Sequence, residues 1–197
     1  MTQHFDLLID TYLENNIGID PLFLPVALCE GLQENILTLQ REGKMIPAQV
    51  GNAVHKDPHQ NMRSDKIYWM DKAHGNSFEN EFLLIAENFV KHLNMTCYTG
   101  INDFEFHYAL YEAGSFYKRH KDQFKNDSNR KYSLISYLND GWTDEDGGQL
   151  CIYQQEVAQT VLPHSQTTVF FKSDEMEHEV TKANRNRMSI TGWLKQV

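Results

Sequence analysis

His120, Asp122 and His178 form the group of residues with the clearest chemical meaning in this sequence. One residue separates His120 from Asp122, so in an extended segment their side chains point to the same side and can bind one ion together. His178 lies far enough along the chain to reach the same ion from another strand. The spacing therefore predicts a metal site with two imidazole ligands and one carboxylate ligand.

Three protein ligands on one face of an ion leave three coordination positions open, as in the facial sites of non-haem Fe(II) oxygenases. A 2-oxoacid needs two of these positions and dioxygen needs one, whereas a closed four-ligand zinc site offers none. The alternative is an accidental pattern, because His-x-Asp is a common tripeptide that can also lie on a surface turn. Polar, loop-like surroundings indicate surface positions for four other histidines: His55, His59, His74 and His164.

The segment RMSITGWL contains a candidate anchor for the co-substrate. In a strand, Arg187 shares one face with Thr191 and Trp193, and apolar side chains occupy the other face. An inward-facing arginine is costly unless it has an anion, and its planar guanidinium can bind a carboxylate through two hydrogen bonds. The distal carboxylate of 2-oxoglutarate is such an anion, and Thr191 could add a hydroxyl hydrogen bond. The alternatives are an exposed or ion-paired Arg187, or an anchor at Arg185, which lies in a turn-like Asn-Arg-Asn stretch.

Two tyrosines fit the same pocket. Tyr137 lies in the alternating segment SLISYL, on the face of Ser133 and Ile135, and Tyr111 lies on the less apolar face of the strand that begins at Phe104. Either phenol could donate a hydrogen bond to a carboxylate. The alternative is ordinary aromatic core with a hydroxyl at the surface, which is the commoner fate of a strand tyrosine.

The charge and the cysteines limit the class of protein. A formal net charge of −9 and a pI near 5.4 argue against non-specific binding to a phosphate backbone. The sequence has three cysteines, Cys29, Cys97 and Cys151. The odd number and the absence of a close pair argue against a disulfide framework or a zinc knuckle and indicate a reducing cytoplasm. The N-terminal residues lack the features of a signal peptide, and no apolar run approaches the length of a membrane span.

Apolar periodicity predicts helices around residues 5–13, 25–39 and 77–93, with Pro25 at the start of the second and Ser77 as the N-cap of the third. The segment between the last two helices has strand-like ends. Its middle, Gly51–Asn61, is polar and contains a proline, which predicts a mobile loop.

From Phe104 the pattern alternates, which predicts a strand. Further strands are expected over 131–139, 147–154, 167–173, 178–183 and 187–194. Many short strands after a helical start predict a mainly β fold with supporting helices, arranged as a double-sheet jelly roll. An open α+β sheet is the alternative from pattern alone.

Several segments in one order resemble the prolyl-hydroxylase-like 2-oxoglutarate/Fe(II) dioxygenases. They run from about Pro47 to Trp193 and read PAQVG, RSDKIYWMD, Tyr111 followed by GSFYKRHKD, ISYLND, DGGQLCIY, VFFKSDEMEHEV and RMSITGWL. The resemblance implies a double-stranded β-helix within a single domain, 1–197. In that domain, 1–103 would be mainly helical support with a substrate loop around 51–61, and 104–197 would be the core.

The resemblance also implies roles for individual residues. His120, Asp122 and His178 would bind Fe(II), and the co-substrates would be 2-oxoglutarate and dioxygen, with ascorbate as an optional reductant. The 2-oxoglutarate site would consist of Arg187, Thr191, Tyr137, Tyr111, Leu150 and Trp193. Arg63 and Asp65 would lie near the substrate entrance. The carboxylate at Asp122 favours hydroxylation, because a halogenase of this superfamily needs that position for chloride.

The segments IYWMD and GSFYKRHKD look most similar to the bacterial and oxygen-sensing prolyl 4-hydroxylases, which act on a proline within a protein. Bacterial members point to elongation factor Tu and animal members to the hypoxia-inducible factor. RSD stands where Arg-Gly-Asp is usual, and the loop from Tyr111 to His120 is one residue shorter than in the animal proteins. Substrate identity therefore stays open, with three alternatives: hydroxylation of free proline or another small molecule, nucleic-acid demethylation, and a non-catalytic binding module.

Overall fold

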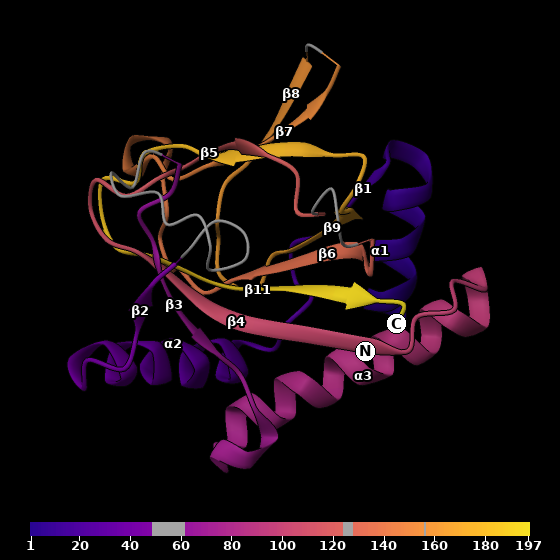
Figure 1. Cartoon of the computed structure of the whole chain (residues 1–197), viewed down its shortest axis with the longest axis horizontal. Helices are drawn as coiled ribbons and strands as arrows, with labels where there is room; N and C mark the ends of the chain where they lie inside the picture. Colours follow the sequence, from indigo (N-terminus) through magenta and orange to yellow (C-terminus); the bar gives the residue numbers. More distant parts are fainter. Residues whose placement is uncertain (49–61, 124–127, 156) are drawn as a thin grey trace.

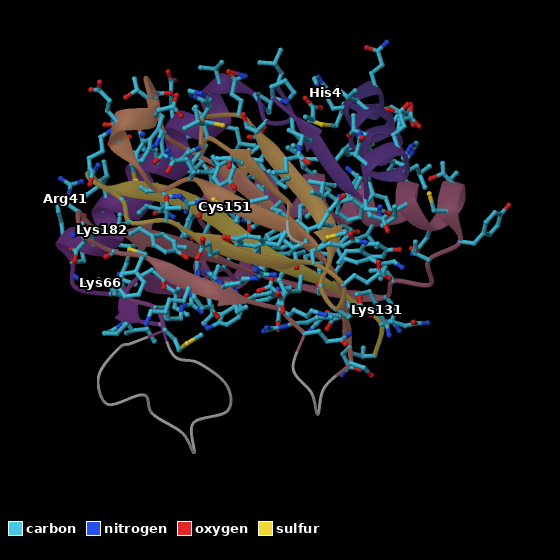
Figure 2. All side chains as sticks on the ribbon, turned by 90° about the horizontal axis from the view of Figure 1, so that it is seen from above. His4, Arg41, Lys66, Lys131, Cys151 and Lys182 are labelled. Atoms are coloured by element: carbon cyan, nitrogen blue, oxygen red, sulfur yellow. The ribbon has the colours of Figure 1, made fainter. Side chains whose placement is uncertain are left out.

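The computed structural model describes residues 1–48, 62–123, 128–155 and 157–197. The loop expected over Gly51–Asn61 lies outside these described residues. Two β-sheets face each other, and helices cover the outer face of the larger one (Figure 1). Figure 2 shows side chains filling the spaces between these layers.

The larger sheet, within the described residues, has seven antiparallel strands in the order β1-β9-β6-β11-β4-β3-β2. Their bounds in that order are β1 Ile17–Asp20, β9 Thr168–Lys172, β6 Arg130–Tyr137, β11 Arg187–Lys195, β4 Asp103–Tyr111, β3 Lys66–Trp69 and β2 Ile46–Pro47. The strands β11, β4 and β6 form the centre, so residues on β11 are flanked by hydrogen-bonded neighbours on both sides.

The smaller sheet has the strand order β5-β10-β7-β8. Its strands are β5 Tyr117–His120, β10 Glu177–Val180, β7 Leu150–Gln154 and β8 Val157–Val161. The hairpin of β7 and β8 extends away from the body of the molecule (Figure 1). This second sheet facing the first is the double-stranded β-helix that the sequence predicted, and the alternative of a single open sheet is wrong.

Three α-helices support the larger sheet in the described residues: α1 (Thr2–Asn15), α2 (Val26–Arg41) and α3 (Ser77–Cys97). Two short 3₁₀ helices, η1 (Lys72–His74) and η2 (Asp144–Asp146), lie in connections. None of the helices in the described ranges is both long and apolar enough to cross a membrane.

The N-cap of α3 corrects one prediction. Ser77 is the first helical residue, and Asn76 is the N-cap. The Asn76 side chain accepts hydrogen bonds from the backbone N–H groups of Phe78 and Glu79, both at 3.0 Å. Asparagine accepts hydrogen bonds from these free donors as well as serine does, and this is why the helix begins one residue earlier than a serine cap would place it.

The alternation in β4 separates two cores. Phe106, Tyr108 and Leu110 pack against the helices, whereas Ala109 and Tyr111 lie between the two sheets. The same division applies to β11, because Met188, Ile190 and Leu194 all belong to the helical core. Residues on the opposite face of these two strands are therefore directed toward the space between the sheets.

Candidate metal centre

His120, Asp122 and His178 come together at one end of the smaller sheet. His120 on β5 is the register partner of His178 on β10, and Asp122 follows β5 by two residues. The Nε2 atom of His120 lies 3.5 Å from Asp122 Oδ1, and the Nε2 atom of His178 lies 3.6 Å from Asp122 Oδ2. One ligand atom from each residue lies within 4.8 Å of the other two.

Backbone carbonyls orient both imidazoles. The Nδ1 atom of His120 lies 2.7 Å from the oxygen of Lys118, and that of His178 lies 3.2 Å from the oxygen of Met176. Because a carbonyl only accepts, each Nδ1 carries the proton, and each Nε2 lone pair is free for an ion. Burial lowers the pKa of His178 to about 4, so this ring is neutral at neutral pH.

The Asp122 carboxylate is buried and ionised. Burial by itself would raise its pKa, but the neighbouring His178 and His120 rings and a hydrogen bond from Ser133 lower the pKa well below the usual range. The Ser133 hydroxyl donates to Asp122 Oδ2 over 2.7 Å. Neutral imidazoles and an ionised carboxylate are the forms that bind a metal ion.

A second group lies beside His120. The Tyr117 ring stacks on the His120 ring, with centroids 3.5 Å apart and planes at 14°. The Arg63 guanidinium lies over the Tyr117 ring, 4.2 Å from its centroid. Arg63 is held by Asp65 through two hydrogen bonds of 2.7 and 2.6 Å, and the Asp65 side chain is fully buried behind it.

Ser64 connects this segment to β5. Its hydroxyl accepts a hydrogen bond from the Phe116 N–H at 3.2 Å, and its carbonyl accepts one from the Ser115 hydroxyl at 3.2 Å. The Ser64 hydroxyl therefore adds a contact that helps to hold Arg63 near the metal centre.

Arg187 is buried on the central strand β11, with 1% of its surface exposed. Its Nε donates to the Gly148 carbonyl at 2.8 Å, and its Nη1 donates to the Ser189 hydroxyl at 3.3 Å. Gly148 permits this approach, because a Cβ at that position would lie 3.0 Å from the Arg187 side chain. Among the described residues, no carboxylate lies within ion-pair distance of Arg187. The guanidinium therefore retains hydrogen-bonding capacity for an anion.

Two phenols flank this guanidinium. The Arg187 carbon Cζ lies 4.9 Å from the Tyr111 ring centroid and 5.0 Å from the Tyr137 ring centroid. Burial raises the pKa of Tyr137 to about 12, and burial also raises the pKa of Tyr111. The Tyr137 hydroxyl is buried and has no hydrogen-bond partner among the described residues. An anion bound by Arg187 would give this phenol an acceptor.

Most of the predicted site residues line one pocket between the two sheets. Tyr137 and Asp65 are the two predicted residues that lie behind its lining. The lining consists of Arg63, His107, Tyr111, Tyr117, His120, Asp122, Ile135, Leu150, His178, Val180, Arg187, Thr191 and Trp193.

Arg185, the competing anchor, lies elsewhere. Its Nη2 donates to the carbonyls of Asp140 and Gly141, and its Nε lies 3.1 Å from Asp146. Its guanidinium also covers the Trp142 ring at 4.3 Å. These contacts use the charge of Arg185 at the surface.

Sequence reasoning did not single out four residues of the lining: His107, Tyr117, Ile135 and Val180. His107 is buried and lies on the same face of β4 as Tyr111, so the alternation of β4 could have identified it as a pocket residue. Its Nδ1 lies 3.0 Å from the Tyr108 carbonyl, and burial lowers its pKa to about 4. Tyr117 could not be found in this way, because the irregular pairing of β5 with β10 breaks the parity.

The residues present fit Fe(II) and 2-oxoglutarate. Ligand atoms bound to one ion at adjacent positions lie roughly 3 Å apart, and the spacings of 3.5 and 3.6 Å are close to this value. Two neutral imidazoles and one carboxylate suit Fe(II) and leave positions open. The Arg187 guanidinium and the Tyr137 hydroxyl offer donors that match a carboxylate at the end of a short diacid.

Comparison with known proteins agrees with this chemistry. Residues 106–195 match the family described as the 2OG-Fe(II) oxygenase superfamily. A prolyl-4-hydroxylase from Pseudomonas putida is 32% identical, with a TM-score of 0.89 and coverage of 98% of this chain and 99% of that chain. A Trichoplax adhaerens prolyl hydroxylase, solved with a peptide of the hypoxia-inducible factor, is 23% identical with a TM-score of 0.88, covering 98% of this chain and 90% of that chain. At that identity the second similarity concerns the fold.

The fold and the site define a metal-dependent oxygenase built on a jelly roll. The chain belongs to the 2OG-Fe(II) oxygenase superfamily, among its prolyl-hydroxylase-like members. It is therefore a 2-oxoglutarate- and Fe(II)-dependent dioxygenase.

Proposed function

We propose that this dioxygenase hydroxylates a prolyl residue within a protein substrate. The observation that carries the proposal is the 32% identity to the Pseudomonas putida prolyl-4-hydroxylase over almost the full length of both chains. The peptide bound to the Trichoplax adhaerens prolyl hydroxylase supports a protein substrate, because a protein of similar fold accepts one.

In this proposal His120, Asp122 and His178 hold the iron. The converging Nε2 atoms and the ionised carboxylate support these roles, as do the backbone carbonyls that fix both histidine tautomers. When bound, Fe(II) and 2-oxoglutarate together activate dioxygen, with oxidative decarboxylation of 2-oxoglutarate to succinate and insertion of one oxygen atom into a C–H bond.

Arg187 would bind the distal carboxylate of 2-oxoglutarate. Its burial without a carboxylate partner in the described chain supports this role, because an unpaired buried cation is costly. Tyr137 and Tyr111 would donate to the same carboxylate, and Thr191 would add its hydroxyl. Leu150 and Trp193 would be apolar walls that exclude water.

Arg63 would contact the substrate at the pocket, and Asp65 would position Arg63. The division of roles follows from burial, since Arg63 lines the pocket and the Asp65 carboxylate lies behind it. Burial by itself would lower the pKa of Arg63, but the hydrogen bonds and charge of Asp65 raise the pKa, so the guanidinium stays charged. A charged donor at the mouth suits the carbonyl groups of a peptide.

We also infer a single domain over residues 1–197 and a reducing, cytoplasmic environment. Strands β1, β2 and β3 from the first 103 residues join the same sheet as β4, β6, β9 and β11, which supports one folding unit. The thiols of Cys29, Cys97 and Cys151 are free, which supports the reducing compartment.

The test of the prolyl substrate is a mass measurement. The protein would be incubated aerobically with Fe(II), 2-oxoglutarate and a proline-containing protein, with bacterial elongation factor Tu as the first probe. We expect the gain of one oxygen atom on a prolyl residue, located by peptide fragmentation, together with succinate formation.

Asp122→Ala protein is the control, because it lacks the carboxylate ligand and should produce neither signal. Succinate formation stimulated by free proline or by a methylated oligonucleotide, with no oxygen added to any protein probe, would replace the proposal by one of those substrates.

A further inference from the structure

Ser133 and Ser173 form a chain of two hydroxyls that ends on the Asp122 carboxylate. The Ser133 Oγ atom lies 2.7 Å from Asp122 Oδ2 and 2.9 Å from the Ser173 Oγ atom. Both serines are fully buried. Ser133 lies on β6, on the face of Tyr137, and Ser173 follows β9, so two neighbouring strands of the larger sheet supply the chain.

The direction of these hydrogen bonds follows from the acceptor. A carboxylate ligand only accepts, so Ser133 must donate its single proton to Asp122. The Ser133 oxygen is then free to accept, and Ser173 donates to it. Each hydroxyl thereby restricts the rotation of the next, and a buried chain of this kind is rigid.

The two oxygens of Asp122 are not equivalent. Oδ1 lies 3.5 Å from His120 Nε2, and Oδ2 lies 3.6 Å from His178 Nε2. Oδ2 takes the bond from Ser133. The hydrogen bond to Oδ2 therefore restricts rotation of the carboxylate relative to the two imidazoles.

We propose that Ser133, supported by Ser173, is a positioning residue that holds the Asp122 carboxylate in the orientation in which it faces the Nε2 atoms of His120 and His178. Loss of the serine would free the carboxylate to rotate, which would alter the metal site at which 2-oxoglutarate would bind. This inference rests on the metal ligands named under the proposed function.

The chain contains a matched control on the same two strands. The Ser136 and Thr168 hydroxyls lie 2.7 Å apart between β6 and β9, and both residues are buried. Because Ser136 is three positions along the strand from Ser133, it lies on the opposite face of β6. Loss of this hydroxyl removes a buried hydrogen bond from the same place in the sheet without touching Asp122.

The experiment loads the metal-free protein with Co(II) and records its visible ligand-field spectrum, then measures 2-oxoglutarate affinity by titration. For Ser133→Ala we expect an altered spectrum and a loss of 2-oxoglutarate affinity on the order of 10-fold or more, as for other residues that orient metal ligands. Ser133→Thr keeps the hydroxyl and should restore both readouts. Ser173→Ala should give a smaller change in the same direction, and it tests the chain if Ser133→Ala does not fold.

Ser136→Ala should leave the spectrum and the 2-oxoglutarate affinity unchanged. If Ser133→Ala and Ser173→Ala behave like Ser136→Ala while Asp122→Ala abolishes Co(II) binding, the positioning role is overturned and the metal ligands stand. If Asp122→Ala binds Co(II) as the unaltered protein does, the ligand assignment fails, and this inference fails with it.

Discussion

The Arg187 guanidinium is a buried charge with two neutral hydrogen-bond acceptors and no carboxylate among the described residues. Natural proteins rarely bury a cation in this way unless a ligand completes its surroundings. The neighbouring Tyr137 hydroxyl also has no hydrogen-bond partner in the part of the chain that the structure describes. Both features have one explanation at the scale of single residues, which is an anionic ligand that binds between them.

We predict that Arg187→Met weakens 2-oxoglutarate binding by about 100-fold or more, because two hydrogen bonds between charged groups contribute roughly 1.5–3 kcal/mol each. Affinity for Co(II) should remain nearly unchanged, since Arg187 is not a metal ligand. Isothermal titration with each ligand measures both quantities.

Arg185→Met is the matched control and should leave 2-oxoglutarate affinity unaltered. A large loss in the Arg185 variant together with normal binding by the Arg187 variant would move the anchor to Arg185.

At the scale of elements, β11 is the strand on which the pocket depends most. It lies between β6 and β4, and it presents Arg187, Thr191 and Trp193 to the pocket while its other face packs on the helices. Gly192 lies between two of these pocket residues. Its missing side chain leaves room for the Phe106 ring and the Glu105 carbonyl of β4, which a Cβ would meet in close contact.

We predict that Gly192→Ala lowers the free energy of unfolding by about 1–3 kcal/mol, the usual cost of overpacking a core. It should also weaken 2-oxoglutarate binding, because Thr191 and Trp193 would shift with the strand. Denaturant unfolding and ligand titration measure the two effects.

Gly43→Ala is the control, since Gly43 has a φ of +67° but open space around it. That change should cost about 1 kcal/mol from backbone strain and should not alter ligand binding. Normal 2-oxoglutarate affinity in the Gly192 variant would show that β4 and β11 can separate without disturbing the pocket.

At the scale of the whole molecule, the buried histidines of the pocket make the free energy of unfolding depend on pH. His107 and His178 are both buried between the sheets, and burial lowers the pKa of each from 6.5 to about 4. Between these two values the unfolded chain binds more protons than the folded chain. Stability is therefore fully present above pH 6.5 and is lost as the pH falls toward 4.

We predict that the metal-free protein loses up to about 3 kcal/mol of its free energy of unfolding per buried histidine over this range. Urea unfolding at pH 7 and at pH 4.5 measures the loss. His107→Leu should reduce the pH dependence by the contribution of one histidine, because it removes the titrating group and keeps an apolar side chain. An unchanged pH dependence in this variant would mean that His107 protonates readily in the folded state.

Much of the fold follows from periodicity, which is a local property of the sequence. Helical spacing located α1, α2 and α3, and alternation located β4, β6, β7, β9, β10 and β11. The strands β1, β5 and β8 did not emerge. All three strands are short. The sequence of β5 is YKRH, in which the outward side chains contact solvent and the inward side chains belong to the metal centre. Alternation of polar and apolar residues cannot reveal a strand whose inner face is itself polar.

The sequence by itself determined which residue types share a face: His120 with Asp122, and Arg187 with Thr191 and Trp193. These relations depend on the two-residue period of a strand. Only the tertiary structure decided that His178 pairs with His120, that no described carboxylate neutralises Arg187, and that two serines support Asp122. Such contacts depend on the register between distant strands, which the whole core selects and which no local pattern encodes.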